Sequence, residues 1–259
     1  DWYNPIKSHN QYSLRDPRRD RKSGRIWRIT AKDGVLADPP NIAGASTDEL
    51  LQVLLAPHYR YRYWARRELR ERNPDQVKKA LDRWVRELDK EDSRLLHHQT
   101  EAIWAYRGIG RRNDAVLKEL LESDNHHARA AATRQLRYWW SSADPNYVAL
   151  AKAATDTNAL VRLEAVIAAS YIGTPGALEA SVAAITQPHA KHLTYAMRTS
   201  LGSQTLKRHW DGNVAFNREH PELAEFMAEF DRRQRLKPRR IISAQDAQFD
   251  TQKNLKRVK

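Results

Sequence analysis

The 259-residue sequence predicts an all-α protein, an α-solenoid in which short helices pair and the pairs stack side by side. Apolar residues recur at helical spacing from Ser46 onward, and Pro or Gly interrupts these stripes at short intervals. Part of the pattern also recurs after 33 residues. Because two short helices cannot bury both faces of a pair, the pairs are expected to stack.

Residues 47–236 hold the predicted helices. Each stripe places an apolar residue every three or four positions, as a helix with one buried face requires. Examples are Val77, Leu81, Trp84, Val85 and Leu88, then Tyr147, Leu150, Ala151 and Ala154, and later Leu178, Val182 and Ile185. The breakers between stripes are Pro57, Pro74, Gly108, Gly110, Pro145, Pro175, Gly176 and Pro188. Their spacing predicts about ten or eleven short helices.

The repeat is clearest around two arginines, Arg129 and Arg162, which lie 33 residues apart. Each follows an aspartate, Asp124 or Asp156, and an asparagine that stand just before a helix. Weaker copies begin at residues 58 and 91 and lack a clear arginine at this position. An aspartate there is expected to cap the helix and also to reach the arginine of a neighbouring repeat. We therefore predict a ladder of Asp124, Arg129, Asp156 and Arg162 along the stack.

One run identifies the type of repeat. Residues 156–165 have the form D-x-N-x-x-V-R-x-E-A. This run resembles the HEAT repeat family, and the resemblance extends over roughly residues 47–205. It implies an array of helix pairs that presents surface to a partner rather than performing chemistry.

The two ends of the chain differ from the helical body. Residues 24–30 alternate basic or polar with apolar residues, which predicts a strand with one buried face. Because one strand is not stable alone, residues 1–32 are interpreted as the last strand or strands of a preceding sheet domain. Residues 33–46, with Pro39, Pro40 and Gly44, form a linker. Residues 237–259 form a second linker or the start of a following β-domain.

The first forty-five residues support a narrower resemblance. Its matching elements are Asn4-Pro5, His9, the run from Ser13 to Pro17, Arg19-Asp20, the run from Gly24 to Ile29, and Ile42 to Ala45. They are similar to the last propeller blade of a membrane-bound dehydrogenase family of planctomycete and verrucomicrobial bacteria, which carries a haem-binding CxxCH motif. The resemblance implies a sorbosone-dehydrogenase-like β-propeller before the helices and an electron-transfer domain after them, either a c-type cytochrome or cupredoxin-like. It also implies a periplasmic or extracellular location.

Cysteine is absent, so this segment has no CxxCH motif and no thiolate metal site, and no cofactor is expected within it. The resemblance places haem c or copper in the neighbouring domains. No catalytic fingerprint occurs either, and the acids stand beside bases in solvated helix-surface patterns. Among the histidines, only His189 and His192 have a spacing that puts two imidazoles on one helical face. We expect capping or surface roles for the histidines, and a metal or haem contact is the alternative.

The net charge of +13 first suggests nucleic acid as a partner. Residues 1–32 account for +6 and residues 231–259 for +7, so the helical body between them is neutral. The main interpretation is therefore a non-catalytic scaffold or protein-interaction segment of a larger secreted redox protein. Its partners are the preceding propeller, the following electron-transfer domain or other chains. The alternative is a DNA-binding HEAT-repeat protein similar to alkylpurine glycosylases, which would require a basic groove.

Aromatic residues supply the candidate partner surface. Tyrosines and Trp64 alternate with arginines over residues 59–67, and a second aromatic group ends a predicted inner helix. Such mixtures form protein-binding hot spots or stack on bases. The competing interpretation is that the aromatics pack the first repeat against the preceding domain, with arginine stems covering them. The residues selected are Tyr61, Trp64, Arg66, Trp139 and Trp140.

Overall fold

The computed structural model describes residues 15–22, 26–27, 29–30, 32–34, 38–141 and 147–236, and the chain divides into two units, residues 1–40 and 41–259. In the first unit the described residues form turns and bends. The strand expected over residues 24–30 is absent from those of its residues that are described, and Ile26 and Ile29 are almost fully exposed. An isolated strand has no ladder partner, which accounts for the difference. The segments 1–14 and 237–259 lie outside the described residues.

The described part of the second unit is helical, which confirms the all-α prediction. It contains thirteen α-helices and one short 3-10 helix, more than the sequence breakers suggested. In order these are α1 (Thr47–Val53), α2 (Tyr59–Arg70), α3 (Pro74–Glu87), α4 (Leu95–Gly108), α5 (Asp114–Leu121), α6 (His126–Trp139), α7 (Tyr147–Ala154), α8 (Ala159–Ile172), α9 (Pro175–Val182), η1 (Ala183–Thr186), α10 (Lys191–Leu201), α11 (Gln204–Trp210), α12 (Val214–Glu219) and α13 (Pro221–Leu236).

The helices begin where a side chain can accept the free N–H groups of the first turn. Asparagine performs this function in α3, α5, α6, α8 and α12, and Ser46 with Glu49 forms a capping box at α1. The expectation that aspartate caps the repeats is therefore wrong. In α6 and α8 the capping residues are Asn125 and Asn158, which leaves the aspartate before each one free for another role.

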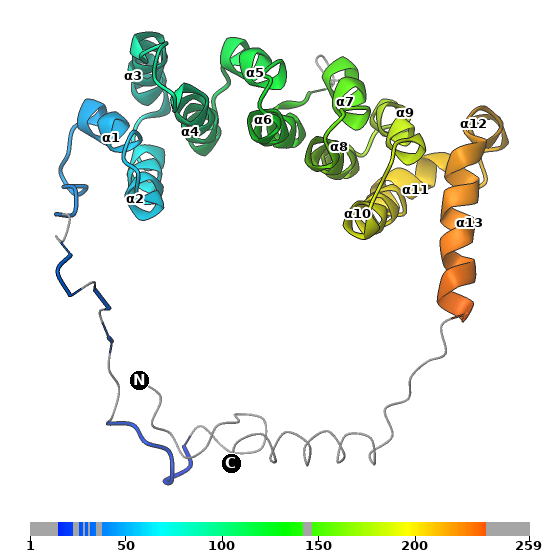
Figure 1. Cartoon of the computed structure of the whole chain (residues 1–259), viewed down its shortest axis with the longest axis horizontal. Helices are drawn as coiled ribbons and strands as arrows, with labels where there is room; N and C mark the ends of the chain where they lie inside the picture. Colours follow the sequence, from blue (N-terminus) through cyan, green and yellow to red (C-terminus); the bar gives the residue numbers. More distant parts are fainter. Residues whose placement is uncertain are drawn as a thin grey trace. The chain divides into compact units, whose positions relative to one another are not determined.

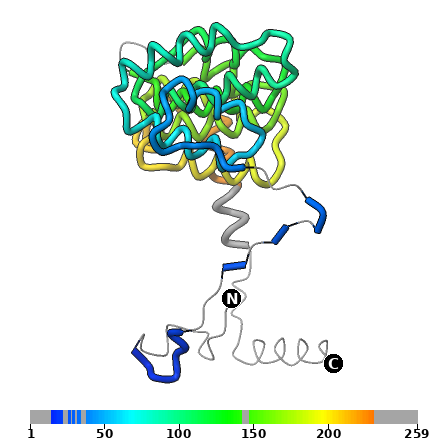
Figure 2. The backbone as a smooth tube through the Cα atoms, turned by 90° about the vertical axis from the view of Figure 1, so that its left-hand side faces the viewer, coloured from blue at the N-terminus to red at the C-terminus, as the bar shows by residue number. Residues whose placement is uncertain are grey.

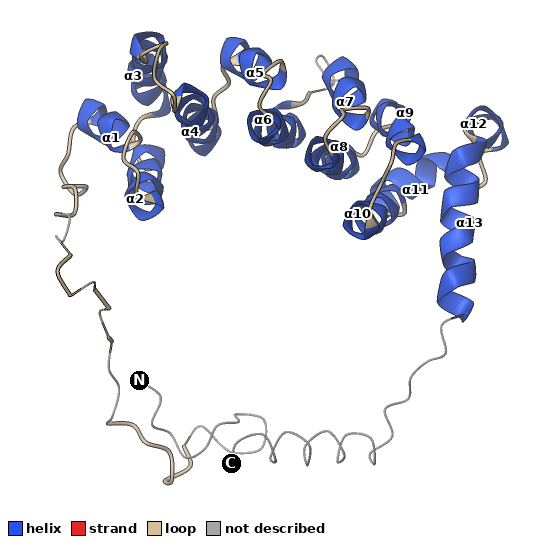
Figure 3. Cartoon of the chain, viewed as in Figure 1, coloured by secondary structure: helices blue, strands red, loops and turns tan. Residues whose placement is uncertain are grey.

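Two rows of helices make up most of the second unit. One row consists of α1, α3, α5, α7 and α9, and the other of α2, α4, α6, α8 and α10 (Figure 1). Each even-numbered helix from α2 to α10 contacts the next one in its row, and α1, α3, α5 and α7 each pack on the helix that follows them in sequence. The helices of these two rows are seen nearly end-on in Figure 1 and run across the view in Figure 2, while Figure 3 shows the short loops that join them.

A single apolar core runs along both rows from Ala45 to Leu223. The predicted stripe of α3 is buried at Val77, Leu81 and Trp84. Helix α8 is apolar on nearly all sides, and it contacts α6, α7, α9, α10 and α11. Small side chains such as Ala165 allow these close approaches. Among the described residues, no helix combines the length and the apolar character needed to cross a bilayer.

One glycine tests the tightness of this packing. A Cβ atom at Gly176, in the first turn of α9, would lie 2.2 Å from the ring of Tyr147, whose hydroxyl contacts Thr174 Oγ1 at 2.5 Å. Gly176→Ala is therefore expected to destabilise the protein by about 1–3 kcal/mol, because the ring must leave its site. Gly108→Ala is the matched control, since nothing lies within 4 Å of that Cβ. Urea unfolding should show a lower free energy of unfolding for Gly176→Ala and an unchanged one for Gly108→Ala.

Candidate interaction face

Three helices of the even-numbered row carry an arginine four residues after the N-cap. These are Arg62 in α2, Arg129 in α6 and Arg162 in α8. In each case Nη1 donates to the carbonyls of the residues six and five positions earlier. The six distances from Nη1 to carbonyl oxygen lie between 2.6 and 3.0 Å. We call this arrangement the arginine clasp, because it closes the turn that leads into the helix.

Each clasp also reaches toward the next helix of its row. Arg62 Nε donates to Glu101 of α4 at 2.8 Å, across 39 residues. Arg129 Nε and Nη2 donate to both carboxylate oxygens of Asp156, at 2.7 and 3.0 Å, across 27 residues. Arg162 Nη2 donates to the carbonyl of Pro188, across 26 residues. One side chain thus closes its own turn and also bonds to the next even-numbered helix or to the turn that leads into it.

Two helices of the row replace this arginine. In α4 the position is His98, whose Nε2 lies 3.1 Å from Asp92 Oδ2, six residues earlier. In α10 it is Thr194, which donates to its own turn at the carbonyl of Ala190. The repeat copies that begin at residues 58 and 91 were expected to lack a clear arginine at this position. That is wrong for the copy from residue 58, where Arg62 makes the contacts of a clasp.

The structure brings only part of the predicted ladder together. Arg129 and Asp156 form a two-bond ion pair whose side chains are 17% and 12% exposed. Asp124 contributes its backbone carbonyl to Arg129, and Arg162 bonds to carbonyl oxygens rather than to a carboxylate. Burial alone would raise the pKa of Asp156, but hydrogen bonds from Arg129 and from the Asn158 N–H outweigh it and lower that pKa.

Glu101 is the most enclosed charge in the described residues of the helical unit. Its side chain is fully buried and accepts bonds from Arg62 of α2 and from Arg66, also of α2. The Arg66 guanidinium additionally lies 5.4 Å from the ring centroid of Trp104 on α4. This group connects α2 and α4 through one carboxylate that two arginines share, so its first role is structural.

Two histidines beside this group, the buried His98 and the partly exposed His97, make stability depend on pH. Burial is the main cause that lowers the pKa of His97 and that of His98; Arg62 also lowers the first, while the Asp92 hydrogen bond opposes the shift of the second. The folded protein therefore keeps both imidazoles neutral at a pH where the unfolded chain, with a pKa near 6.5, takes up protons. Stability present above pH 6.5 is lost as the pH falls through the folded-state values.

We expect the urea midpoint to fall between pH 7.5 and 5.5. The double variant His97→Gln/His98→Gln should reduce the change of the urea midpoint with pH, because glutamine does not titrate. His127→Gln is the control, since His127 is exposed at the start of α6. An unchanged slope in the double variant would show that other groups cause the dependence.

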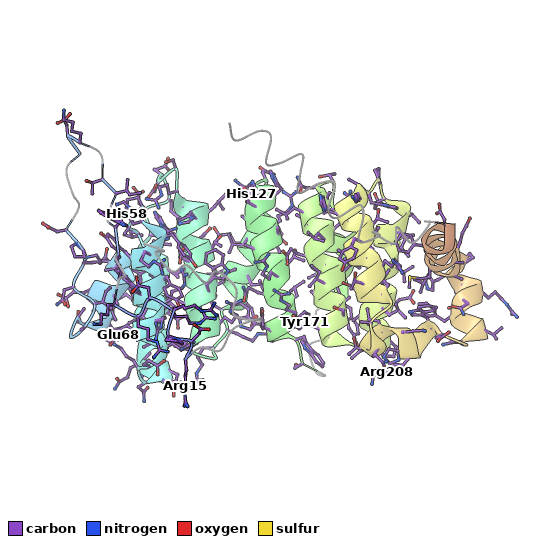
Figure 4. All side chains as sticks on the ribbon, turned by 90° about the horizontal axis from the view of Figure 1, so that it is seen from below. Arg15, His58, Glu68, His127, Tyr171 and Arg208 are labelled. Atoms are coloured by element: carbon purple, nitrogen blue, oxygen red, sulfur yellow. The ribbon has the colours of Figure 1, made fainter. Side chains whose placement is uncertain are left out.

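A row of alternating arginine and tyrosine crosses α4, α6 and α8 near their C-terminal ends. We call Arg107, Tyr138, Arg137 and Tyr171 the Arg–Tyr row. The guanidinium of Arg107 lies 4.7 Å from the ring centroid of Tyr138, and that of Arg137 lies 5.0 Å from Tyr138 and 4.8 Å from Tyr171. Tyr138 and Tyr171 are 47% and 63% exposed. Figure 4 places Tyr171 at the opposite end of the helices from His58 and His127.

Positive charge accumulates around this row. Burial and then the neighbouring charges of Arg137, Arg134 and Arg66 lower the pKa of Arg107, although Tyr138 opposes them. Arg134 is compensated by Glu164, which is 4% exposed on α8. Within the described part of the chain, no ion pair joins Arg107 or Arg137 to a carboxylate.

The residues selected from the sequence separate into two groups. Tyr61 and Trp64 stack on each other with centroids 5.9 Å apart, and Trp64 is 38% exposed. Trp139 is only 5% exposed and Trp140 packs against the core, so these two do not present a surface. Their neighbour Tyr138 points outward instead. A helix that buries position 139 exposes position 138, about 100° away, and the aromatic cluster alone does not reveal which residue faces the core.

Sequence inspection also missed Arg107, Arg137 and Tyr171. A signal exists in the sequence, because Arg107, Tyr138 and Tyr171 each stand 13 residues after the N-cap of their helix.

A cavity of about 630 Å³ lies between the α5–α6 and α7–α8 pairs, with Leu117 and Leu121 on its wall. The Arg129–Asp156 pair also lines it.

His189 Nδ1 lies 2.8 Å from Thr194 Oγ1. In the described residues, no group of three or more His, Cys, Asp or Glu side chains is placed to hold a metal.

No protein-family model matches the chain, and no curated protein matches it either.

Proposed function

We propose that residues 47–236 form a HEAT-like α-solenoid that acts as a non-catalytic protein-interaction scaffold. The observation that carries the proposal is the arginine clasp, which recurs with the same two carbonyl acceptors in α2, α6 and α8. Arg62 precedes Arg129 by 67 residues, close to two steps of the 33 that separate Arg129 from Arg162. A recurring link between successive pairs is what a stacked array requires, since each pair contacts only its neighbours.

Charge favours a protein partner over DNA. The helical body is neutral, and Arg62, Arg66, Arg129 and Arg134 are occupied by carboxylates. Strong duplex binding needs many free cations along the phosphate backbone. Exposed tyrosines beside arginine are instead typical of protein-binding hot spots.

We extend the proposal to the parent protein on the resemblance of residues 1–45 alone. In that context the array is part of a secreted dehydrogenase-like protein in the periplasm or outside the cell. It holds a β-propeller and an electron-transfer domain at a fixed distance, and haem c or copper belongs to those neighbours. A preceding blade would also supply the ladder partners that residues 24–30 need to pair as a strand.

Site-specific photocrosslinking tests the scaffold function. p-Benzoylphenylalanine replaces Tyr171, which is exposed on α8, or Glu119, which is exposed on α5 in the other row. In the organism that makes the protein, position 171 is expected to give protein adducts many-fold more often than position 119. Adducts to nucleic acid, or equal yields from both positions, would contradict the proposal.

A further inference from the structure

We propose that the Arg–Tyr row binds an extended acidic segment of a partner protein through its carboxylates. The inference rests on the proposed scaffold function and names the chemistry of the partner. Its basis is the contrast between the arginines of one face. Arg66 and Arg134 have carboxylate partners on the next helix, whereas Arg107 and Arg137 are held only by tyrosine rings in the described structure.

The stacking fixes the guanidinium groups in place and does not use their terminal Nη donors, whereas Nε of Arg137 is buried. A ring over the planar face does not use the N–H groups, which project from the edge of that plane. The two guanidinium carbons lie 4.7 and 5.0 Å from the centroid of Tyr138, so they are at most about 10 Å apart. In an extended chain, alternate side chains project to one side about 7 Å apart. The spacing of acidic residues at positions i and i+2 falls within this upper limit on the separation of Arg107 and Arg137.

The local field also favours negative charge. Arg107 is half-buried, and the positive charges of Arg137, Arg134 and Arg66 disfavour its own charge. A carboxylate that arrives there relieves this repulsion and forms charge-assisted, two-bond contacts, which are among the strongest hydrogen bonds in proteins. The partial negative charges at the C-terminal ends of α4 and α6 stabilise the two arginines themselves.

The same geometry disfavours single-stranded nucleic acid. Base stacking needs a free aromatic face. Two guanidinium groups already lie over Tyr138, and a third contact places Arg137 over Tyr171. Two uncompensated cations are also few for a phosphate backbone, which carries a charge at every nucleotide.

Fluorescence anisotropy tests the proposal on the full chain. The probe is a fluorescein-labelled peptide of alternating Glu and Ser, with a Gln–Ser peptide as its uncharged match and labelled single-stranded DNA as the competing class. At low salt we expect the Glu–Ser peptide to bind and the other two to bind much more weakly. Arg107→Gln and Arg137→Gln should each weaken peptide binding about tenfold.

Three variants separate this surface from general charge. Arg60→Gln removes one exposed positive charge from α2 and should leave peptide binding unchanged. Tyr138→Phe keeps the ring and should retain binding, whereas Tyr138→Ala should weaken it because Arg107 and Arg137 lose their support.

Equal effects of Arg60→Gln and Arg107→Gln, or tighter binding of DNA than of the Glu–Ser peptide, would overturn the proposal. Protein adducts at position 171 without any preference for the acidic peptide would leave the scaffold function standing and refute only the acidic partner. Absence of both would refute both.

Discussion

Replacing Arg129 by Met is expected to lower the free energy of unfolding by about 3 kcal/mol. The substitution leaves Asp156 without its two-bond partner at a site that is only 12% exposed. It also removes the donor from the carbonyls of Ser123 and Asp124. The loss of one partner of a mostly buried pair costs far more than the pair contributes, because the remaining charge stays desolvated. Urea unfolding followed by circular dichroism measures the change.

The control for Arg129→Met is Arg83→Met, since the Arg83–Asp48 pair joins side chains that are 49% and 68% exposed. It should cost less than about 1 kcal/mol. The double variant Arg129→Met/Asp156→Leu should lose less than the sum of its two single variants, because no unpaired charge remains. If Arg129→Met and Arg83→Met had equal effects, the clasp would have no special role in stability.

Glu101→Gln is the second change with a large expected effect, a loss of about 3–5 kcal/mol. Glu101 is fully buried and compensates both Arg62 and Arg66. Glutamine keeps the shape but removes the charge, so two guanidinium groups remain close together without a counter-charge. Thermal unfolding and urea unfolding should both show the loss.

Glu71→Gln provides the matched control, because Glu71 and its partner Arg70 are 70% and 56% exposed. The free energy of unfolding of Glu71→Gln should equal that of the unchanged protein within about 0.5 kcal/mol. A stable Glu101→Gln protein would mean that water reaches the Arg62–Glu101 contact. The contact would then contribute no more than a surface pair.

The helical fold could be predicted because apolar residues recur at helical spacing along the chain. The stripe from Val77 to Trp84 fixes which side of α3 is buried, and the asparagines before α6 and α8 mark where those helices start. Such signals are local, and they do not depend on which helices become neighbours. The strand expected over residues 24–30 shows the limit of a local signal, since a strand also needs a partner.

The candidate interaction face could not be predicted in the same way. The contact from Arg107 to Tyr138 joins residues on different helices, and neither residue alone differs from an ordinary surface side chain. Trp139 looked like a better surface candidate because it is larger, but the phase of α6 turns it into the core. Arg62 was overlooked because neighbouring arginines in α2 concealed it, and only its bonds to Ala56 and Pro57 identify it as a clasp.

The claim central to the proposal is that helix pairs stack one after another, with arginine clasps linking α2 to α4, α6 to the turn before α8 and α8 to the turn before α10, rather than gathering around a single centre. Hydrogen–deuterium exchange of the full chain and of Arg129→Met tests it most directly. We expect the variant to exchange faster in α5 to α8, on either side of the Arg129–Asp156 pair, and to keep the exchange of α1 to α3 unchanged. Faster exchange by the same factor in every helix would contradict the claim.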